Sequence, residues 1–266
     1  MEALPTRPAR RETPAAGSVQ SVARALRALE FVAASRDGVT AKELAAHLDI
    51  ALPSTYHVLT TLIEAGYLVH LSQEHRYGLG YRVRLLEQGL EKQLEVPPQT
   101  VEAIKRLHVE ADAAAYYAVY RDIDVVVAHV ADSDRRPRVR VLDIGFHEAT
   151  HATAFGKVML AAMTPEDRDA YLDRVGLRRC AEHTITDRAD LEEHLVQVRK
   201  SGVALEINEF QSGLSCLAAP VWSRAGAVVA SVAVSLSSAE FAVRRWDLER
   251  AVRRGALVAT RAVNNA

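Results

Sequence analysis

Residues 40–79 constrain the fold of this chain more than any other segment, because they carry the start and stop signals of two short helices. Thr40 lies three residues before Glu43. This is the spacing of a capping box, in which the threonine hydroxyl and the glutamate carboxylate each accept a backbone N–H at the start of a helix. Leu44 and Leu48 follow at helical spacing, and residues 49–51 leave room only for a tight turn.

A second helix and a hairpin are predicted after this turn. Pro53 is tolerated in the first turn of a helix, and Gly66 can end that helix. Strand-like residues 67–71 and 76–79 flank a polar turn at residues 72–75. This order of elements predicts a winged helix-turn-helix, which lays its second helix in the major groove of DNA. A helical subdomain that never meets nucleic acid is the alternative.

The expected DNA contacts are polar side chains that lie off the apolar faces of these helices and on the hairpin. They are Arg24, Lys42, Ser54, Tyr56, His57, Thr61 and Arg76. Such groups can bind phosphates or base edges. Residues 1–80 contain eight Lys and Arg against eight Asp and Glu, so this part has no net charge. Because non-specific affinity depends on phosphate neutralisation, we expect weak binding to random DNA and a reliance on base contacts and dimerisation.

The sequence after residue 80 predicts a linker helix and a second domain. Val83, Leu86, Leu90 and Leu94 recur at helical spacing before Pro97-Pro98, which cannot continue a helix. We therefore expect a disordered tail at residues 1–17 and a winged helix-turn-helix domain at residues 18–80. Residues 81–96 are expected to form a linker and dimer helix, and residues 97–266 the second domain.

Strand-like and helical segments alternate irregularly in the second domain. The expected strands are residues 115–119, 125–130, 138–142, 217–222 and 227–236. The expected helices are residues 99–114, a segment from 164 to about 176, a segment around 191–198, and residues 240–263. This mixture predicts an α+β fold with an antiparallel sheet flanked by helices.

No residue pattern in the chain indicates catalysis, a metal or a membrane. No serine or cysteine lies in a motif that would place a base beside it. Four residues of ligand type have separations that fit no common zinc site: His151, Cys180, His183 and His194. Cys180 and Cys216, the only cysteines, are not spaced as a redox pair. No apolar run comes near 20 residues and no secretory signal is present, so we expect no membrane contact. We also expect a cytoplasmic protein without a cofactor, and no disulfide, because the cytosol is reducing.

Beyond these patterns, both halves of the chain resemble the IclR-type transcriptional regulators. The N-terminal resemblance lies in residues 21–26 (SVARAL), 54–59 (STYHVL), 64–68 (EAGYL) and 77–80 (YGLG). The C-terminal resemblance lies in residues 151–161 (HATAFGKVMLA), 206–210 (EINEF), 213–214 (GL) and 216–221 (CLAAPV). It extends from about residue 19 to residue 262 in the family's order. The resemblance implies a DNA-binding homodimer, or a dimer of dimers, whose GAF-like domain binds a small metabolite.

The resemblance also implies an effector site. Its residues by position are Ala154, Phe155, Gly156, Glu206, Cys216 and Ser235. Backbone N–H groups at a helix start favour an anion, while a thiol and a hydroxyl add donors without bulk. The chain has His57 where many relatives have arginine, Glu206 where they often have aspartate, and Ala233 where they often have serine. These departures weaken the case for guanine readout and imply a pocket of different shape, in which Glu206 repels a carboxylate unless it is protonated.

The leading hypothesis is a sequence-specific DNA-binding transcriptional regulator that is not an enzyme. A repressor is favoured over an activator. Its partners would be an inverted-repeat operator in double-stranded DNA and a small effector, for which an organic acid is the favoured class. Two alternatives stay open: a GAF-like enzyme or redox sensor that works through Cys216, and a sensing module that acts on a protein partner. The helix-turn-helix at family spacing disfavours both.

Overall fold

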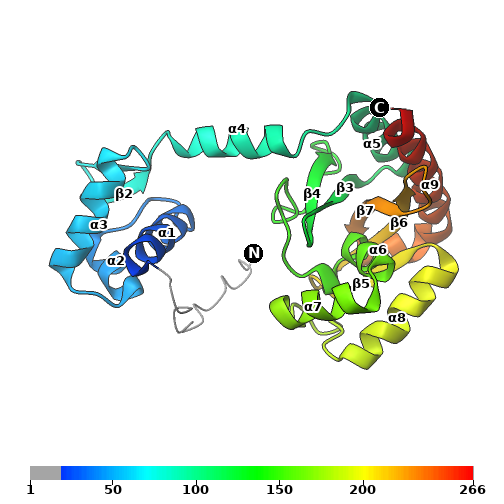
Figure 1. Cartoon of the computed structure of the whole chain (residues 1–266). Coiled ribbons are helices and arrows are strands. Elements are labelled where there is room, and N and C mark those ends of the chain that lie inside the picture. The colour runs from blue at the N-terminus through cyan, green and yellow to red at the C-terminus, as the bar shows by residue number, and fades with distance from the viewer. Residues whose placement is uncertain (1–18, 266) are drawn as a thin grey trace. The chain divides into compact units, whose positions relative to one another are not determined.

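The computed structural model describes residues 19–265 as two compact units, which divide between Leu90 and Glu91 (Figure 1). The predicted tail at residues 1–17 lies outside the described residues. Among the helices of residues 19–265, none is long and apolar enough to cross a membrane.

The first unit contains three packed helices and a hairpin, as residues 40–79 predict. These elements are α1 (Gln20–Ala33), α2 (Ala41–Leu48), α3 (Leu52–Glu64), β1 (Leu68–Leu71) and β2 (Arg76–Leu79). The strands β1 and β2 pair antiparallel, and Val39 forms a further bridge with Tyr77. Leu44, Leu59 and Leu68 lie in the core between the helices and the hairpin. The winged helix-turn-helix fold is therefore confirmed.

Local chemistry explains where these helices begin and end. The Thr40 N–H donates to Glu43 Oε2 at 2.7 Å, and the Glu43 N–H donates to Thr40 Oγ1 at 3.2 Å, which completes the predicted capping box of α2. Asp49 adopts a left-handed conformation (φ 55°) that ends α2. The helix α4 (Val83–Gln93) follows the hairpin and spans the division between the units.

The second unit is a five-stranded antiparallel sheet with helices on both faces. Its strands are β3 (Ala114–Arg121), β4 (Asp124–Ala131), β5 (Ala204–Ile207), β6 (Leu214–Trp222) and β7 (Val228–Ser237), in the order β4-β3-β7-β6-β5. Its helices are α5 (Pro98–Ala111), α6 (Ala154–Ala162), α7 (Pro165–Val175), α8 (Arg188–Ser201) and α9 (Ser238–Asn265), with a 3₁₀ turn, η1 (Thr150–Ala152), before α6. The helices α5 and α9 pack on one face, and α6 packs on the other (Figure 1). This arrangement confirms the α+β class.

Two details of the second domain differ from the expectation. Residues 138–142 do not form a strand. Pro137 supplies no backbone donor, and the Arg138 N–H and guanidinium both donate to Asp132 at 3.0–3.1 Å, which holds this segment in a loop. The short edge strand β5, which the sequence did not predict, lies in the segment of the second expected family motif.

Candidate DNA-recognition and effector sites

The helix α3 presents a polar exposed face opposite its buried face. Leu59 and Leu62 pack into the first unit, as predicted. Four of the predicted contact residues are exposed on α3: Ser54, Tyr56, His57 and Thr61. Thr60 is also exposed on α3 and was missed by the sequence analysis; its position three residues after His57 was the available signal.

One hydroxyl on this face is already committed to the helix. Thr61 Oγ1 donates to the His57 carbonyl at 2.9 Å. In this rotamer Thr61 can only accept a hydrogen bond from DNA. The exposed side chains of this face that could still donate to a base or phosphate are Ser54, Tyr56, His57 and Thr60.

Arg76 holds the hairpin against the rest of the first unit. Its Nε and Nη2 donate to the Gly38 carbonyl at 3.1 and 2.9 Å, and Nη2 lies 3.2 Å from Glu43 Oε2. Gly38 has φ +73°, and a Cβ there would lie 2.5 Å from the Tyr77 carbonyl oxygen, so the position requires glycine. Arg76 thus orients the wing, and only part of its guanidinium is available to a phosphate.

The other two predicted contacts lie on the first two helices. Arg24 is partly exposed on α1, and Lys42 is exposed in the first turn of α2. Either cation can reach solvent, which a phosphate contact requires.

Three of the predicted effector residues form one row across the sheet. Glu206 on β5 is the register partner of Cys216 on β6, and Cys216 is the partner of Ser235 on β7. All three side chains are buried. Residues that are 29 positions apart in sequence therefore meet as neighbours, because antiparallel strands align them.

Glu206 has one satisfied oxygen and one without a partner. Its Oε1 accepts the backbone N–H groups of Glu209 and Phe210 at 2.7 and 3.1 Å. Its Oε2 is buried and has no hydrogen-bond partner among the described residues. Burial raises the pKa of Glu206, although the adjacent Cys216 thiol and these two backbone donors act in the opposite direction. Burial therefore makes protonation of Glu206 easier than in water, and a protonated carboxyl could donate a hydrogen bond from Oε2.

Cys216 is a buried thiol with little nucleophilic character. Burial and the adjacent Glu206 raise its pKa well above the usual thiol value. Because the thiolate is the reactive form of cysteine, this environment disfavours the enzyme and redox-sensor alternative. Cys216 and Cys180 are both free cysteines.

Tyr116 extends the row on the side of Ser235 and was not predicted. Its hydroxyl accepts the Val139 N–H at 3.0 Å and can donate to Ser235 Oγ at 3.0 Å. Burial raises the pKa of Tyr116 to about 12, so the hydroxyl keeps its proton. The signal in the sequence was the alternation along β3, which places Tyr116 on the same face as Ala114 and Ala118.

A buried ion pair lies beside the row and was also missed. Lys157 Nζ lies 2.5 Å from both carboxylate oxygens of Glu209 and donates to the Leu205 carbonyl at 3.3 Å. Burial lowers the pKa of Lys157 and raises the pKa of Glu209, while their attraction opposes both shifts. A lysine within the otherwise apolar residues 154–162 was the signal for such a pair.

The remaining predicted effector residues form the first turn of α6. Ala154, Phe155 and Gly156 are all buried. Thr153 caps the helix, because its Oγ1 accepts the Gly156 N–H at 3.3 Å. A Cβ at Gly156 would lie 2.1 Å from the Thr150 carbonyl oxygen, so glycine allows η1 to pack against α6. Ser231 on β7 donates to the Phe155 carbonyl at 3.2 Å and holds this turn to the sheet.

Three phenylalanine rings lie together in this region. Phe146 makes edge-to-face contacts with Phe155 and Phe210, at centroid distances of 6.3 and 5.5 Å. Phe146 lies in the segment between β4 and η1, and its carbonyl accepts the Val127 N–H at 2.9 Å. The rings form an apolar cluster that adjoins the polar row at Glu206, because the Phe210 N–H donates to Glu206 Oε1.

The described residues contain no group of three or more His, Cys, Asp or Glu side chains that could hold a metal ion. His151, one of the ligand types considered above, is buried and its Nε2 lies 2.9 Å from the Arg178 carbonyl. Burial lowers its pKa, so the neutral ring fits this backbone contact.

Two family models match the chain and together cover most of it. The model of the IclR helix-turn-helix domain matches residues 21–72. The model of the bacterial transcriptional regulator IclR C-terminal domain matches residues 92–259.

Individual relatives agree with these models. The chain is 31% identical to the HTH-type transcriptional regulator BhcR of Paracoccus denitrificans, over 82% of this chain and 78% of that protein. It is 26% identical to the transcriptional repressor IclR of Escherichia coli, over 86% of this chain and 84% of that protein. The crystal structure of a transcriptional regulator from Rhodococcus sp. RHA1 is similar, with a TM-score of 0.72 and 26% identity over 92% of this chain and 98% of that one. All three are described as regulators of transcription rather than enzymes.

Proposed function

Because the chain belongs to the IclR family of bacterial transcriptional regulators, we propose that it represses transcription from an inverted-repeat operator, and that a small organic acid modulates this binding. The row of Glu206, Cys216 and Ser235 across three strands is the observation that supports an acid as the ligand. As a DNA-bound regulator it would work in the cytoplasm.

The chemistry of the row favours a carboxylate ligand over a cation. A protonated Glu206 donates from Oε2, and the Cys216 thiol and Ser235 hydroxyl are further donors. Carboxylate oxygens accept such bonds. The charge of Lys157 adds a favourable potential, although Glu209 compensates most of it. The row therefore offers neutral donors close to a buried cation.

The aromatic cluster favours an acid with a ring. Phe146, Phe155 and Phe210 offer ring edges and faces to a planar ligand. An IclR homolog from Microbacterium hydrocarbonoxydans, 19% identical with a TM-score of 0.71, was crystallised in complex with 4-hydroxybenzoate. That protein shares the fold, and its ligand makes 4-hydroxybenzoate a rational first probe.

The experiment measures operator occupancy against a panel of acids that includes 4-hydroxybenzoate. The operator is first located by genomic footprinting with the purified protein. Cys216→Ala and Ser235→Ala should leave operator binding intact and raise the acid concentration needed for a response about fivefold, as expected for one lost hydrogen bond of about 1 kcal/mol. Cys180→Ala is the matched control, because Cys180 lies outside the row.

Glu206→Gln separates the two charge states of this residue. The amide keeps a donor and an acceptor but cannot ionise, so the response to a carboxylate should no longer weaken as pH rises through the pKa of Glu206. If Glu206→Gln, Cys216→Ala and Ser235→Ala all respond like the wild type, the acid binds elsewhere.

The dimer is proposed to form through apolar side chains that the first unit leaves exposed. Val22 and Leu26 on α1 are 54% and 55% exposed, and Leu86 on α4 is 58% exposed. Leu26→Glu and Leu86→Glu should reduce the mass measured by light scattering and weaken operator binding. Leu257→Glu, on α9 and outside this surface, is the control and should leave this dimer and its operator binding unchanged. The same measurement distinguishes a dimer from a dimer of dimers.

Operator geometry and the sign of regulation follow from two further measurements. A two-fold dimer reads half-sites on one face of DNA, so inserting about five base pairs between them should abolish tight binding. Unchanged affinity would refute this geometry. Transcription in vitro from the footprinted promoter should fall when the protein is added, and a rise would identify an activator.

A further inference from the structure

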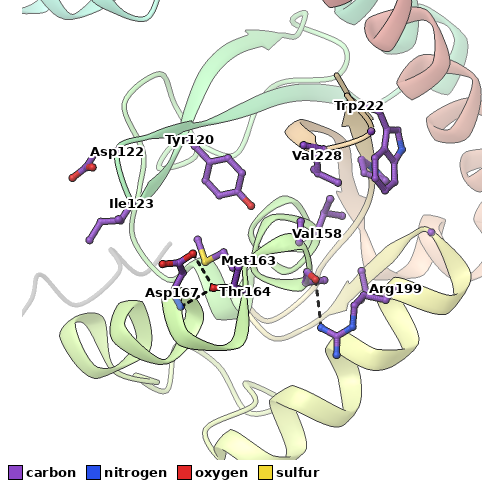
Figure 2. Close-up of a pocket in the computed structure, with 17 residues that line it drawn as sticks. Tyr120, Asp122, Ile123, Val158, Met163, Thr164, Asp167, Arg199, Trp222 and Val228 are labelled. Atoms are coloured by element: carbon purple, nitrogen blue, oxygen red, sulfur yellow. Dashed lines mark hydrogen bonds between the residues drawn. The ribbon is translucent and has the colours of Figure 1, made fainter. Parts of the chain in front are cut away.

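A cavity opens at the C-terminal end of α6, and the Glu206 row does not line it. Its volume is about 620 Å³, within the range of small-molecule sites (Figure 2). Its walls include Tyr120 from β3, Val158 and Met163 at α6, and Trp222 and Val228 from β6 and β7. None of the six predicted effector residues contributes to its lining.

Small buried side chains separate this cavity from the row. Ala118, Ala218 and Ala233 lie in the core beneath α6 and are no more than 1% exposed. Along β3, Tyr116 contacts the row and Tyr120 lines the cavity, with Ala118 between them. Along β6, Cys216 lies in the row and Trp222 lines the cavity. The two sites therefore lie on one face of the sheet with a closed floor between them.

The electrostatics of the cavity favour a positive ligand. Asp122 and Asp167 lie on one side of it, and Trp222 and Arg199 on the other (Figure 2). The positive charge of Arg199 is compensated only in part, because Glu192 lies 2.5 Å from Arg199 Nη2 and also 2.8 Å from Arg168 Nη2. The two aspartates, Asp122 and Asp167, therefore outweigh the charge that Glu192 leaves uncompensated. The C-terminal end of α6 also borders the cavity, and its Ala161 and Met163 carbonyls accept hydrogen bonds from Arg199 and Arg168 at 3.4 and 3.3 Å.

The aromatic walls favour the same kind of ligand. The Tyr120 hydroxyl donates to the Met159 carbonyl at 2.6 Å, which fixes the ring. Trp222 is 44% exposed and lines the cavity. Faces of tyrosine and tryptophan attract organic cations, and the aliphatic walls accept an apolar body.

From this arrangement we propose that the cavity is a second small-molecule site, which binds an aromatic organic cation. The cationic group lies near Tyr120, Asp122 and Asp167, and the apolar body extends toward Val228 and Trp222. This site is distinct from the acid site, because the lining, the location and the preferred charge of the ligand all differ.

The test uses benzyltrimethylammonium and the fluorescence of Trp222. The chain has two tryptophans, so the Trp246→Phe protein reports on Trp222 alone. Trp246 is 72% exposed, which makes this replacement tolerable. Benzyltrimethylammonium should change the emission saturably with a Kd below about 1 mM, whereas benzyl alcohol should bind at least about tenfold more weakly and phenylacetate more weakly still.

Three substitutions test where the cation lies: two remove the charge of an aspartate, and one places a bulky side chain in the cavity wall. Asp122→Asn and Asp167→Asn should each weaken benzyltrimethylammonium binding about threefold to fivefold, as expected for one exposed charge contact. Asn tolerates the left-handed φ of 57° at Asp122 and still accepts the Thr164 hydroxyl at position 167. Ala162→Phe, at an exposed position at the end of α6, should fill the cavity and abolish binding.

Asp169→Asn, also on α7 but outside the cavity, is the matched control and should bind like the wild type. Circular dichroism confirms that each variant is folded. Three results would overturn the proposal: equal binding of the cation, the alcohol and the acid; unchanged affinity in both Asn variants; or no saturable change in Trp222 emission, as expected if another copy of the chain covers the cavity.

Discussion

Replacing Lys157 with methionine should destabilise the second unit strongly and make its stability depend on pH. The lysine side chain is fully buried, and its Nζ lies 2.5 Å from both oxygens of Glu209, whose side chain is 9% exposed. Methionine keeps the length and removes the charge, so Glu209 is left buried without its partner. Loss of one member of a buried ion pair costs about 3–5 kcal/mol, which is the loss expected at pH 7.

The pH dependence follows from the direction of the shift. Burial already raises the pKa of Glu209 above its usual value of 4.5, and removal of Lys157 raises it further. Between the unfolded and the folded pKa, the folded variant binds more protons than the unfolded chain. Its free energy of unfolding is therefore highest below the unfolded pKa and falls by about 1.4 kcal/mol per pH unit as pH rises to the folded pKa.

Urea unfolding followed by tryptophan fluorescence measures this effect. Both tryptophans, Trp222 and Trp246, lie in the second unit, so the signal excludes the first unit. Lys157→Met with Glu209→Gln is the matched control, because it has no ionisable group at position 209. The pH dependence due to Glu209 is obtained by subtracting the slope of the unfolding free energy against pH in the double variant from the slope in the single variant. If the single variant loses less than about 1 kcal/mol and shows no extra slope, the ion pair does not stabilise the fold.

Two further predictions concern the two units separately. Arg76→Ala should weaken binding to every DNA sequence and lower the slope of log affinity against log salt by about one unit for each bound chain, whereas His57→Ala should change the preference among half-site variants. Equal losses across all variants for both proteins would show that His57 does not read bases. Gly156→Ala should strongly lower the melting temperature, since its Cβ would lie 2.1 Å from the Thr150 carbonyl oxygen, while Gly89→Ala, with nothing within 4 Å, should be neutral or stabilising by about 1 kcal/mol; similar melting temperatures for both would contradict this.

The features predicted correctly from the sequence depend on short spacings. The capping box at Thr40 and Glu43 is complete within four residues, and Pro53 marks the first turn of α3. Such signals act through the local backbone, so no knowledge of distant contacts is needed. The same holds for the polar face of α3, which follows from helical periodicity once Leu59 and Leu62 are assigned to the core.

The features that were missed or wrong depend on contacts between distant residues. Residues 138–142 have a strand-like composition, but the contacts of Arg138 with Asp132 override it. The ion pair of Lys157 and Glu209 joins residues 52 positions apart, and no local pattern links them. The row of Glu206 and its neighbours was named by resemblance alone, because the register of β5, β6 and β7 cannot be obtained from periodicity.

The position of α6 would let one short helix connect the two proposed ligand sites. Its nine residues span about 13 Å. Lys157, near its start, binds Glu209, whose N–H donates to Glu206, and its last turn lines the cavity. Residues 154–161 are all buried, and the alanines of the sheet bring the helix close to the strands. A tightly packed helix of this kind moves as one body rather than bending, because the surrounding core has no space to absorb a local distortion. A ligand that displaces one end of α6 must therefore alter the packing at the other end, and this physical link would make the acid and cation sites sense each other.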